Sequence, residues 1–140
     1  MVSSGLEILF DGTNIARILT GMLRVAEISI CSLLIGFLFG IIFGILRTSE
    51  SIIVKLIFKI YLEIFRIMPL LVLLFLFYYI LPEIFQTTIS NMTVSIVVFI
   101  LWISSEVSDI VRSTLISVSK AQIDAGRALG LSMIQQYRYI

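Results

Sequence analysis

The chain has 140 residues, of which 59% are hydrophobic and 14% charged, and its mean hydropathy is +1.13. A water-soluble domain of this length needs far more polar surface, so the composition indicates an integral membrane protein. A net charge of +1 gives no electrostatic reason to expect a nucleic-acid partner. With no histidine and one cysteine, Cys31, the chain can form neither an internal disulfide nor a multi-cysteine metal site, and we expect no metal.

The N-terminal residues are not typical of a cleaved signal peptide, because Glu7 and Asp11 precede any basic residue. We assign residues 1–20 to an extracytoplasmic N-terminal segment. Residues 28–46 carry no charge, and this run is as long as one helical crossing of a bilayer. The sequence therefore predicts a first membrane span at about residues 24–46.

Small residues recur every four positions inside this span, at Ser32, Gly36, Gly40 and Gly44. That spacing places them on one helix face, where a second helix can approach closely. The stripe has two interpretations: a homodimer seam, or packing inside the chain's own bundle. We favour the second.

The second apolar run, residues 67–81, is too short to cross a bilayer, so the predicted span begins upstream and covers about residues 60–81. Because Pro69 has no backbone N–H, a kink or a new helix start is expected there. Pro82 is expected to close the span.

The segment before this span, residues 52–66, is expected to be an amphipathic helix at the membrane surface. Its charged residues recur at helical spacing and form one stripe, consisting of Lys55, Lys59, Glu63 and Arg66. Glu63 and Arg66 are three residues apart and can pair where the helix enters lipid.

A third span is predicted at about residues 91–113. Its uncharged core is too short to cross alone, and a full crossing includes Glu106 and Asp109, with Arg112 following at the same spacing. Ionisable residues at this depth normally face a bundle interior or an aqueous cavity, so Ser105, Glu106 and Asp109 are candidate residues of a translocation path. The alternative, which we weight slightly higher, is a cytoplasmic helix end held by pairing of Arg112 with Glu106 or Asp109.

The distribution of basic residues predicts the orientation of the chain. Of the ten basic residues, four lie in segment 47–66 and four from residue 112 onward. The N-terminal flank has two, Arg17 and Arg24, and the loop 82–93 has none. The positive-inside rule therefore places the N-terminus outside and residues 114–140 in the cytoplasm.

The polar C-terminal segment, residues 119–140, predicts two short helices. Ser119 with Gln122 and Ser132 with Gln135 both fit the capping box S-x-x-Q. Gly130 is expected to end the first helix with a positive φ. The first helix presents small residues beside a charged edge, which suits a groove on another protein, although the chain's own surface is an alternative.

The stretch DAGRALGLS, residues 124–132, resembles the E-A-A-x-x-x-G cytoplasmic loop of permease subunits of ATP-binding-cassette importers. The stretches RVAEISICSLLIGFLFGIIFGILRTS and EIFRIMP resemble the polar amino acid permeases that carry histidine, glutamate, glutamine or arginine. Asp124, Ala125 and Gly126 stand where that family has Glu-Ala-Ala, and Gly130 matches its glycine. The resemblance runs from about residue 20 to the end of the chain.

The resemblance implies that residues 119–140 form the coupling loop, which docks on a separate ATPase subunit. The docking residues that it implies are Lys120, Asp124, Ala125, Gly126, Arg127, Ala128, Gly130 and Leu131. The chain contains no G-x-x-x-x-G-K-[ST] phosphate loop, so it is not expected to be an enzyme or to hold a cofactor. ATP-Mg would be used by the partner.

The predicted fold class is all-α, a polytopic membrane helical bundle with cytoplasmic coupling helices. The family ordinarily has five membrane spans, and about three are expected here. Residues 21–140 are therefore interpreted as an incomplete importer transmembrane domain in the bacterial inner membrane. The resemblance implies three protein partners besides the lipid bilayer: ATPase subunits, a second permease subunit that is identical or different, and an extracytoplasmic amino acid-binding protein. The competing hypothesis is a small membrane scaffold or channel subunit that needs no ATPase.

Overall fold

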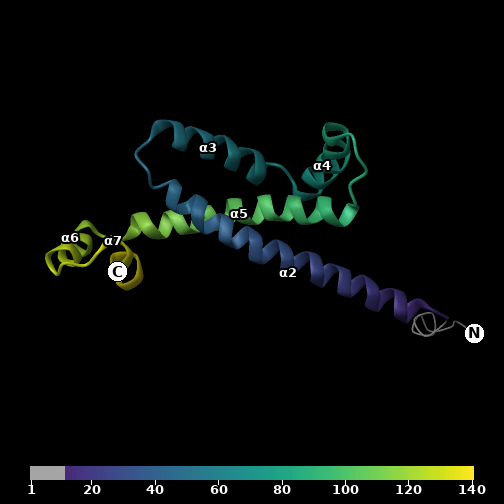
Figure 1. Ribbon diagram of the computed structural model, residues 1–140, viewed down its shortest axis with the longest axis horizontal. Helices are drawn as coiled ribbons and strands as arrows, with labels where there is room; N and C mark the ends of the chain where they lie inside the picture. Colours follow the sequence, from purple (N-terminus) through teal and green to yellow (C-terminus); the bar gives the residue numbers. More distant parts are fainter. Residues whose placement is uncertain (1–11) are drawn as a thin grey trace, which may run out of the picture.

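The computed structural model describes residues 12–140, and this part of the chain contains helices and no strand (Figure 1). The all-α fold class is therefore confirmed. The helices, in chain order, are α2 (Asn14–Leu46), α3 (Ile52–Ile67), α4 (Leu70–Phe85), α5 (Asn91–Ser117), α6 (Lys120–Ala128) and α7 (Met133–Tyr139).

Two of these helices, α2 and α5, are long and apolar enough to cross a membrane without a break. They have 33 and 27 residues, or about 50 and 40 Å of helix against a hydrocarbon core of about 30 Å. α2 starts at Asn14, so part of the segment assigned to residues 1–20 is helical, while residues 1–11 lie outside the described part. Both helices run toward the end of the molecule from which α6 and α7 project (Figure 1).

Residues 60–81 do not form one straight helix. α3 and α4 are bent by 108° at the break between them, so the pair is either a broken span or a re-entrant loop. Met68 has extended backbone angles, φ −72° and ψ 132°, because the residue before a proline is disfavoured in helical geometry. The Pro69 carbonyl then accepts hydrogen bonds from the N–H groups of Val72 and Leu73, which starts α4.

Pro82 does not end the second apolar segment as expected, because α4 continues through it to Phe85. Pro82 lies inside the helix, so its missing N–H removes the helical hydrogen bond to the Tyr78 carbonyl, and its ring crowds that carbonyl without ending the helix. The helix ends instead at Gln86, which adopts a left-handed conformation with φ +47°. The Thr87 N–H donates to the Pro82 carbonyl at 3.2 Å and closes the turn.

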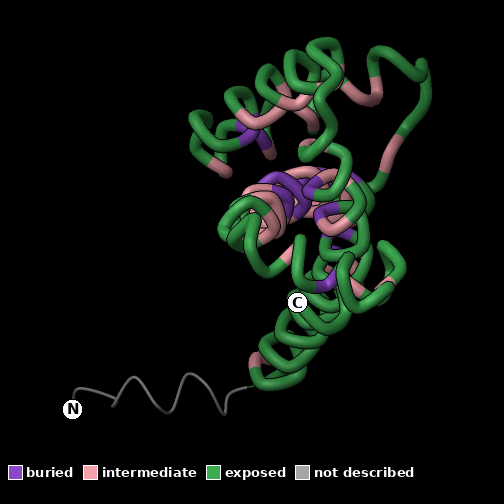
Figure 2. The backbone as a smooth tube through the Cα atoms, turned by 90° about the vertical axis from the view of Figure 1, so that its left-hand side faces the viewer, coloured by how far each residue is buried: buried purple, intermediate pink, exposed green. Residues whose placement is uncertain are grey.

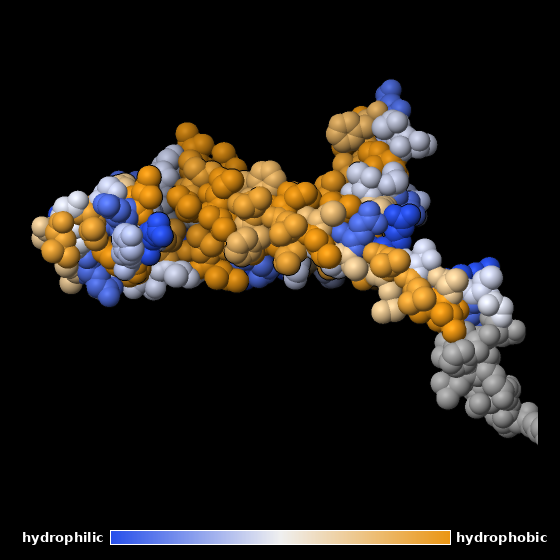
Figure 3. Space-filling view, turned by 60° about the horizontal axis from the view of Figure 1, so that its bottom comes forward, coloured by the Kyte–Doolittle hydropathy of each residue, from blue (hydrophilic) through white to orange (hydrophobic). Residues whose placement is uncertain are grey.

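The buried core is small and lies where α3, α4 and α5 meet. It consists of Phe65, Leu73, Val94 and Val98. The buried residues lie mainly along α5 and on the parts of other helices that pack against it, and most of the remaining chain is exposed (Figure 2). The face seen in Figure 3 is mostly hydrophobic along its middle, with polar residues toward the α6–α7 end. Such an apolar exterior suits a bundle whose surroundings are lipid chains instead of water.

Candidate functional site

The small-residue stripe of α2 faces α5 of the same chain. Ser32, Gly36, Gly40 and Gly44 are the buried residues of α2. A Cβ atom built on Gly40 would lie 2.5 Å from Val107 Cβ and 3.3 Å from the Ser104 carbonyl oxygen. Gly36 and Gly44 meet the neighbouring turns of α5 in the same way. At these three glycines the two helices therefore approach so closely that a side chain on α2 would collide with α5.

A network of four charged side chains joins α2, α3 and α5 at the end of this seam that follows Gly44. Asp109 accepts hydrogen bonds from Arg47 Nη2 at 3.1 Å and from Arg66 Nη1 at 2.9 Å. Arg66 Nε also donates to Glu106 at 3.2 Å, and Arg47 Nη1 donates to Ser108 Oγ at 3.2 Å. Two positive and two negative groups thus compensate each other, which lowers the cost of placing charge inside a membrane bundle.

The sequence placed the correct carboxylates on α5 but assigned them the wrong partners. Arg66 does not pair with Glu63, whose nearest basic group is Lys59 Nζ at 4.0 Å. Arg112 pairs with neither predicted carboxylate, and its Nε donates to the Arg47 carbonyl at 3.3 Å. Contacts between helices bring Arg47 and Arg66 to α5, so pairing within one helix was the wrong expectation.

The position of Arg47 against α5 has one signal in the sequence. Arg47 follows Gly44 by three residues, so it continues the stripe that faces α5. Arg66 had no such signal, because its position depends on the bend at Pro69.

Ser105 differs from the other two candidate path residues. It is fully buried, and its hydroxyl donates to the Trp102 carbonyl of its own helix at 2.7 Å. Glu106 and Asp109 keep 38% and 34% of their side-chain surface exposed. Of the three candidates, these two therefore keep part of their side-chain surface exposed, whereas Ser105 does not.

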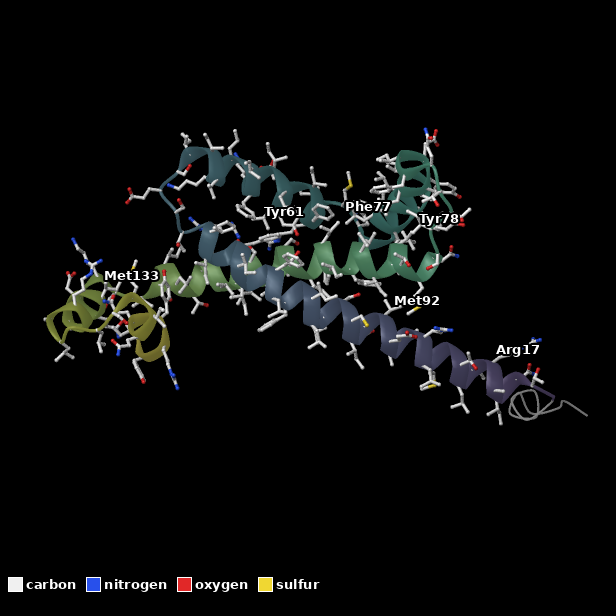
Figure 4. The ribbon with its side chains drawn as sticks, in the orientation of Figure 1. Arg17, Tyr61, Phe77, Tyr78, Met92 and Met133 are labelled. Carbon is white, nitrogen blue, oxygen red and sulfur yellow. The ribbon has the colours of Figure 1, made fainter. Side chains whose placement is uncertain are left out.

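Tyr61 links α3 to α5 beside the charged network and was not predicted. Its hydroxyl donates to the Leu101 carbonyl at 2.6 Å and shares a hydrogen bond with Ser104 Oγ at 2.7 Å. The ring lies between the two helices (Figure 4) and contacts Phe43 and Phe65, with centroid separations of 5.7 and 4.9 Å. Both hydrogen bonds depend on residues about 40 positions away, which no local pattern indicates.

The C-terminal helix–turn–helix follows the predicted capping pattern. Both capping boxes, at Ser119 and Ser132, are confirmed. Gly130 has φ +72°, which confirms the expected positive value. Its N–H donates to the Arg127 carbonyl at 2.9 Å, and the Leu131 N–H donates to the Gly126 carbonyl at 3.0 Å. These two bonds form a Schellman motif, so the turn between α6 and α7 is a defined structure.

Most residues assigned to docking lie on the exposed surface of this unit: Lys120, Asp124, Ala125, Arg127, Ala128 and Gly130. Leu131 is half-buried. Gly126 is buried, so within this chain it does not lie on the exposed surface with the others. It faces α7, where a Cβ atom would lie 2.5 Å from Ile140 Cδ1. A larger residue here would require the Ile140 side chain to shift, so Gly126 forms part of the contact between α6 and α7.

Within residues 12–140, no group of three or more His, Cys, Asp or Glu side chains is placed to hold a metal ion.

The fold and the site define a polytopic helical membrane protein. It has apolar spanning helices, a charged network between them and a capped helix–turn–helix at one end. Residues 36–140 match the family described as the binding-protein-dependent transport system inner membrane component. The chain belongs to that family, and the resemblance seen in the sequence is confirmed.

Similar proteins include amino acid permeases of two bacteria. The glutamate/aspartate import permease protein GltJ of Escherichia coli K12 is 31% identical over 91% of this chain and 57% of its own length. The probable glutamine ABC transporter permease protein GlnP of Bacillus subtilis 168 is 31% identical over 94% of this chain and 60% of its own length. The chain thus spans a little more than half of these relatives.

A solved structure also matches, the crystal structure of an amino acid ABC transporter with histidines. The TM-score is 0.67 and the sequence identity 25%, over 89% of this chain and 61% of that chain. The arrangement of α2 to α7 is therefore shared with part of a transporter subunit.

Proposed function

We propose that the chain is a membrane-spanning permease subunit of an ATP-binding-cassette importer for a polar amino acid. The observation that carries this proposal is the exposed α6–Gly130–α7 unit at the end of the helix bundle. The chain that carries this unit belongs to a family of transport system components. The relatives' names, glutamate/aspartate and glutamine permeases, support the substrate class.

In this proposal α6 is the coupling helix. Its exposed edge offers Lys120, Asp124 and Arg127, and the nearest ion pair, between Arg127 and Asp124, is long at 3.6 Å and exposed. Such a pair contributes little and can be exchanged for charge-assisted hydrogen bonds to an ATPase subunit. ATP-Mg would be consumed in that subunit, and closure there would move α6 and the end of α5.

The partial exposure of Glu106 and Asp109 supports their proposed place along the translocation path. A second permease subunit, identical or different, would complete this path, and an extracytoplasmic binding protein would deliver the amino acid. Ser105 would act as a packing residue behind the path, because its hydroxyl is already bonded within α5.

Replacing Gly130 with valine tests the coupling role. A β-branched residue is penalised at φ +72°, so the turn should be distorted and α6 misplaced. In the importer reconstituted in vesicles with its ATPase and binding protein, we expect amino acid uptake per ATP hydrolysed to fall at least about tenfold. Asp124→Ala should weaken ATPase association in a pull-down.

The matched control is Gly12→Val, a glycine with φ +58° before α2 and far from α6. It imposes the same backbone strain and should leave uptake unchanged. Fully coupled uptake by the Gly130→Val importer would show that α6 does not transmit closure. Failure of the chain to associate with any ATPase would favour a scaffold or channel subunit instead.

Orientation is tested separately by cysteine labelling in a Cys31→Ser background. We expect Thr88→Cys, in the exposed loop between α4 and α5, to react with a membrane-impermeant maleimide added outside intact cells. Ala121→Cys, exposed on α6, should react only after permeabilisation. The reverse labelling pattern would place α6 outside and remove it from any cytoplasmic ATPase.

A further inference from the structure

A basic pocket of about 420 Å³ lies between the end of α2, the middle of α3 and the last part of α5. It is lined by Arg47, Lys55, Lys59, Leu62, Glu63 and Arg112. α2 and α5 both run toward this end of the molecule, from which α6 and α7 project (Figure 1). We call this cavity the basic pocket.

The basic pocket keeps an excess of positive charge after the ion pairs are counted. Arg47 is matched by Asp109, which belongs to the charged network between the helices. Glu63 lies 4.0 Å from Lys59. Within residues 12–140, Lys55 and Arg112 form no ion pair with a carboxylate. Lys55, Lys59 and Arg112 against Glu63 leave a surplus of two positive charges.

The two arginines of the basic pocket are held in place by contacts between helices. The Arg47 side chain is only 12% exposed and donates to Ser108 and Asp109. Arg112 Nε donates to the Arg47 carbonyl, which leaves the terminal amino groups of Arg112 available. A guanidinium fixed in this way is well suited to a phosphate group, because it presents parallel N–H donors.

The opposite face of α3 is apolar and open. Its large exposed side chains are Ile53, Ile57, Ile60 and Ile64. Because the family is a membrane component, acyl chains are the expected neighbours of this face. With one charged and one apolar face, α3 is expected to lie at the membrane surface, where lipid headgroups surround the basic pocket.

We propose that the basic pocket binds the phosphate headgroup of an anionic phospholipid. Lys55 and Lys59 would supply flexible charges, and Arg112 would supply the directed hydrogen bonds. Basic pockets between membrane helices commonly select such headgroups. The proposal depends on membrane location and not on transport, so it can fail or hold independently of the importer function.

The test measures lipid binding by the whole chain, purified in a non-ionic detergent, with native mass spectrometry and mixed micelles of phosphatidylglycerol. We expect one phosphatidylglycerol to be retained tightly, and phosphatidylcholine to bind at least tenfold more weakly. Lys55→Gln/Lys59→Gln should lower the affinity for phosphatidylglycerol about 30-fold, because each basic residue near an anionic headgroup contributes about fivefold. Both lysines are exposed, so the helical circular dichroism should stay unchanged.

The matched control is Arg17→Gln/Arg24→Gln, which removes the same charge from exposed positions near the start of α2. Its affinity should stay within about twofold of the original. Unchanged binding by the lysine variant, or equal binding of the two lipids, would overturn the proposal. Displacement of the lipid by equimolar glycerol 1-phosphate would identify a small-anion site and also overturn it.

Discussion

Gly40→Leu is expected to lower the free energy of unfolding of the helix bundle by about 3 kcal/mol, at the upper end of overpacking effects. Even the first atom of the new side chain would lie 2.5 Å from Val107 Cβ, and the α5 backbone is directly behind it. α2 and α5 form the most extensive helix contact in the described chain, so separating them weakens the whole bundle. The measurement is the thermal unfolding midpoint in detergent.

Gly21→Leu is the matched control, because Gly21 lies in the same helix and a Cβ there meets nothing within 4 Å. It should leave the free energy of unfolding unchanged or raise it by up to about 1 kcal/mol, because leucine favours the helical conformation more than glycine does. If Gly40→Leu fails to fold, Gly40→Ala provides the milder test and should still lower the midpoint. A midpoint equal to that of the original chain in both Gly40 variants would contradict the close seam.

Asp109→Asn is expected to lower the free energy of unfolding by about 2–3 kcal/mol. The substitution keeps the shape of the side chain but removes the charge that compensates Arg47 and Arg66 at 3.1 and 2.9 Å. Arg47 suffers most, because its side chain is 12% exposed and has little access to water. The thermal midpoint in detergent again reports the effect.

Asp124→Asn is the control for the charge change itself. Its pair with Arg127 is exposed at 3.6 Å, so the loss should stay below about 0.5 kcal/mol. A double-mutant cycle of Asp109→Asn with Arg47→Met should give a coupling energy of at least about 1 kcal/mol. A coupling energy of zero would show that Asp109 and Arg47 are close without stabilising the bundle.

The charged network and the basic pocket share Arg47, which connects two functions proposed for one end of the bundle. Its guanidinium ties α2 to α5, while its carbonyl holds Arg112 at the basic pocket. Lipid binding and the packing of α2 on α5 are therefore expected to stabilise each other.

Local sequence was sufficient for features whose partners lie within a few residues. The capping boxes at Ser119 and Ser132 join positions three apart, and the left-handed turn at Gly130 is favoured by glycine itself. The spacing of Ser32 and the three glycines indicated one face of a helix, because helical periodicity is also local. The hydrophobic composition indicated a membrane bundle, because composition can be read without knowing which residues are in contact.

Only the tertiary structure decided which charges meet and which way the chain turns. Arg66 reaches Glu106 and Asp109 from 40 and 43 residues away, after the 108° bend between α3 and α4. The proline indicated a break, but its angle depends on how Phe65 and Leu73 pack against α5. Gly126 likewise becomes a packing residue only when α7 folds back on α6. Each outcome depends on packing between side chains that are distant in the sequence. Helical periodicity and residue propensity describe only neighbouring residues, so they could not predict these contacts.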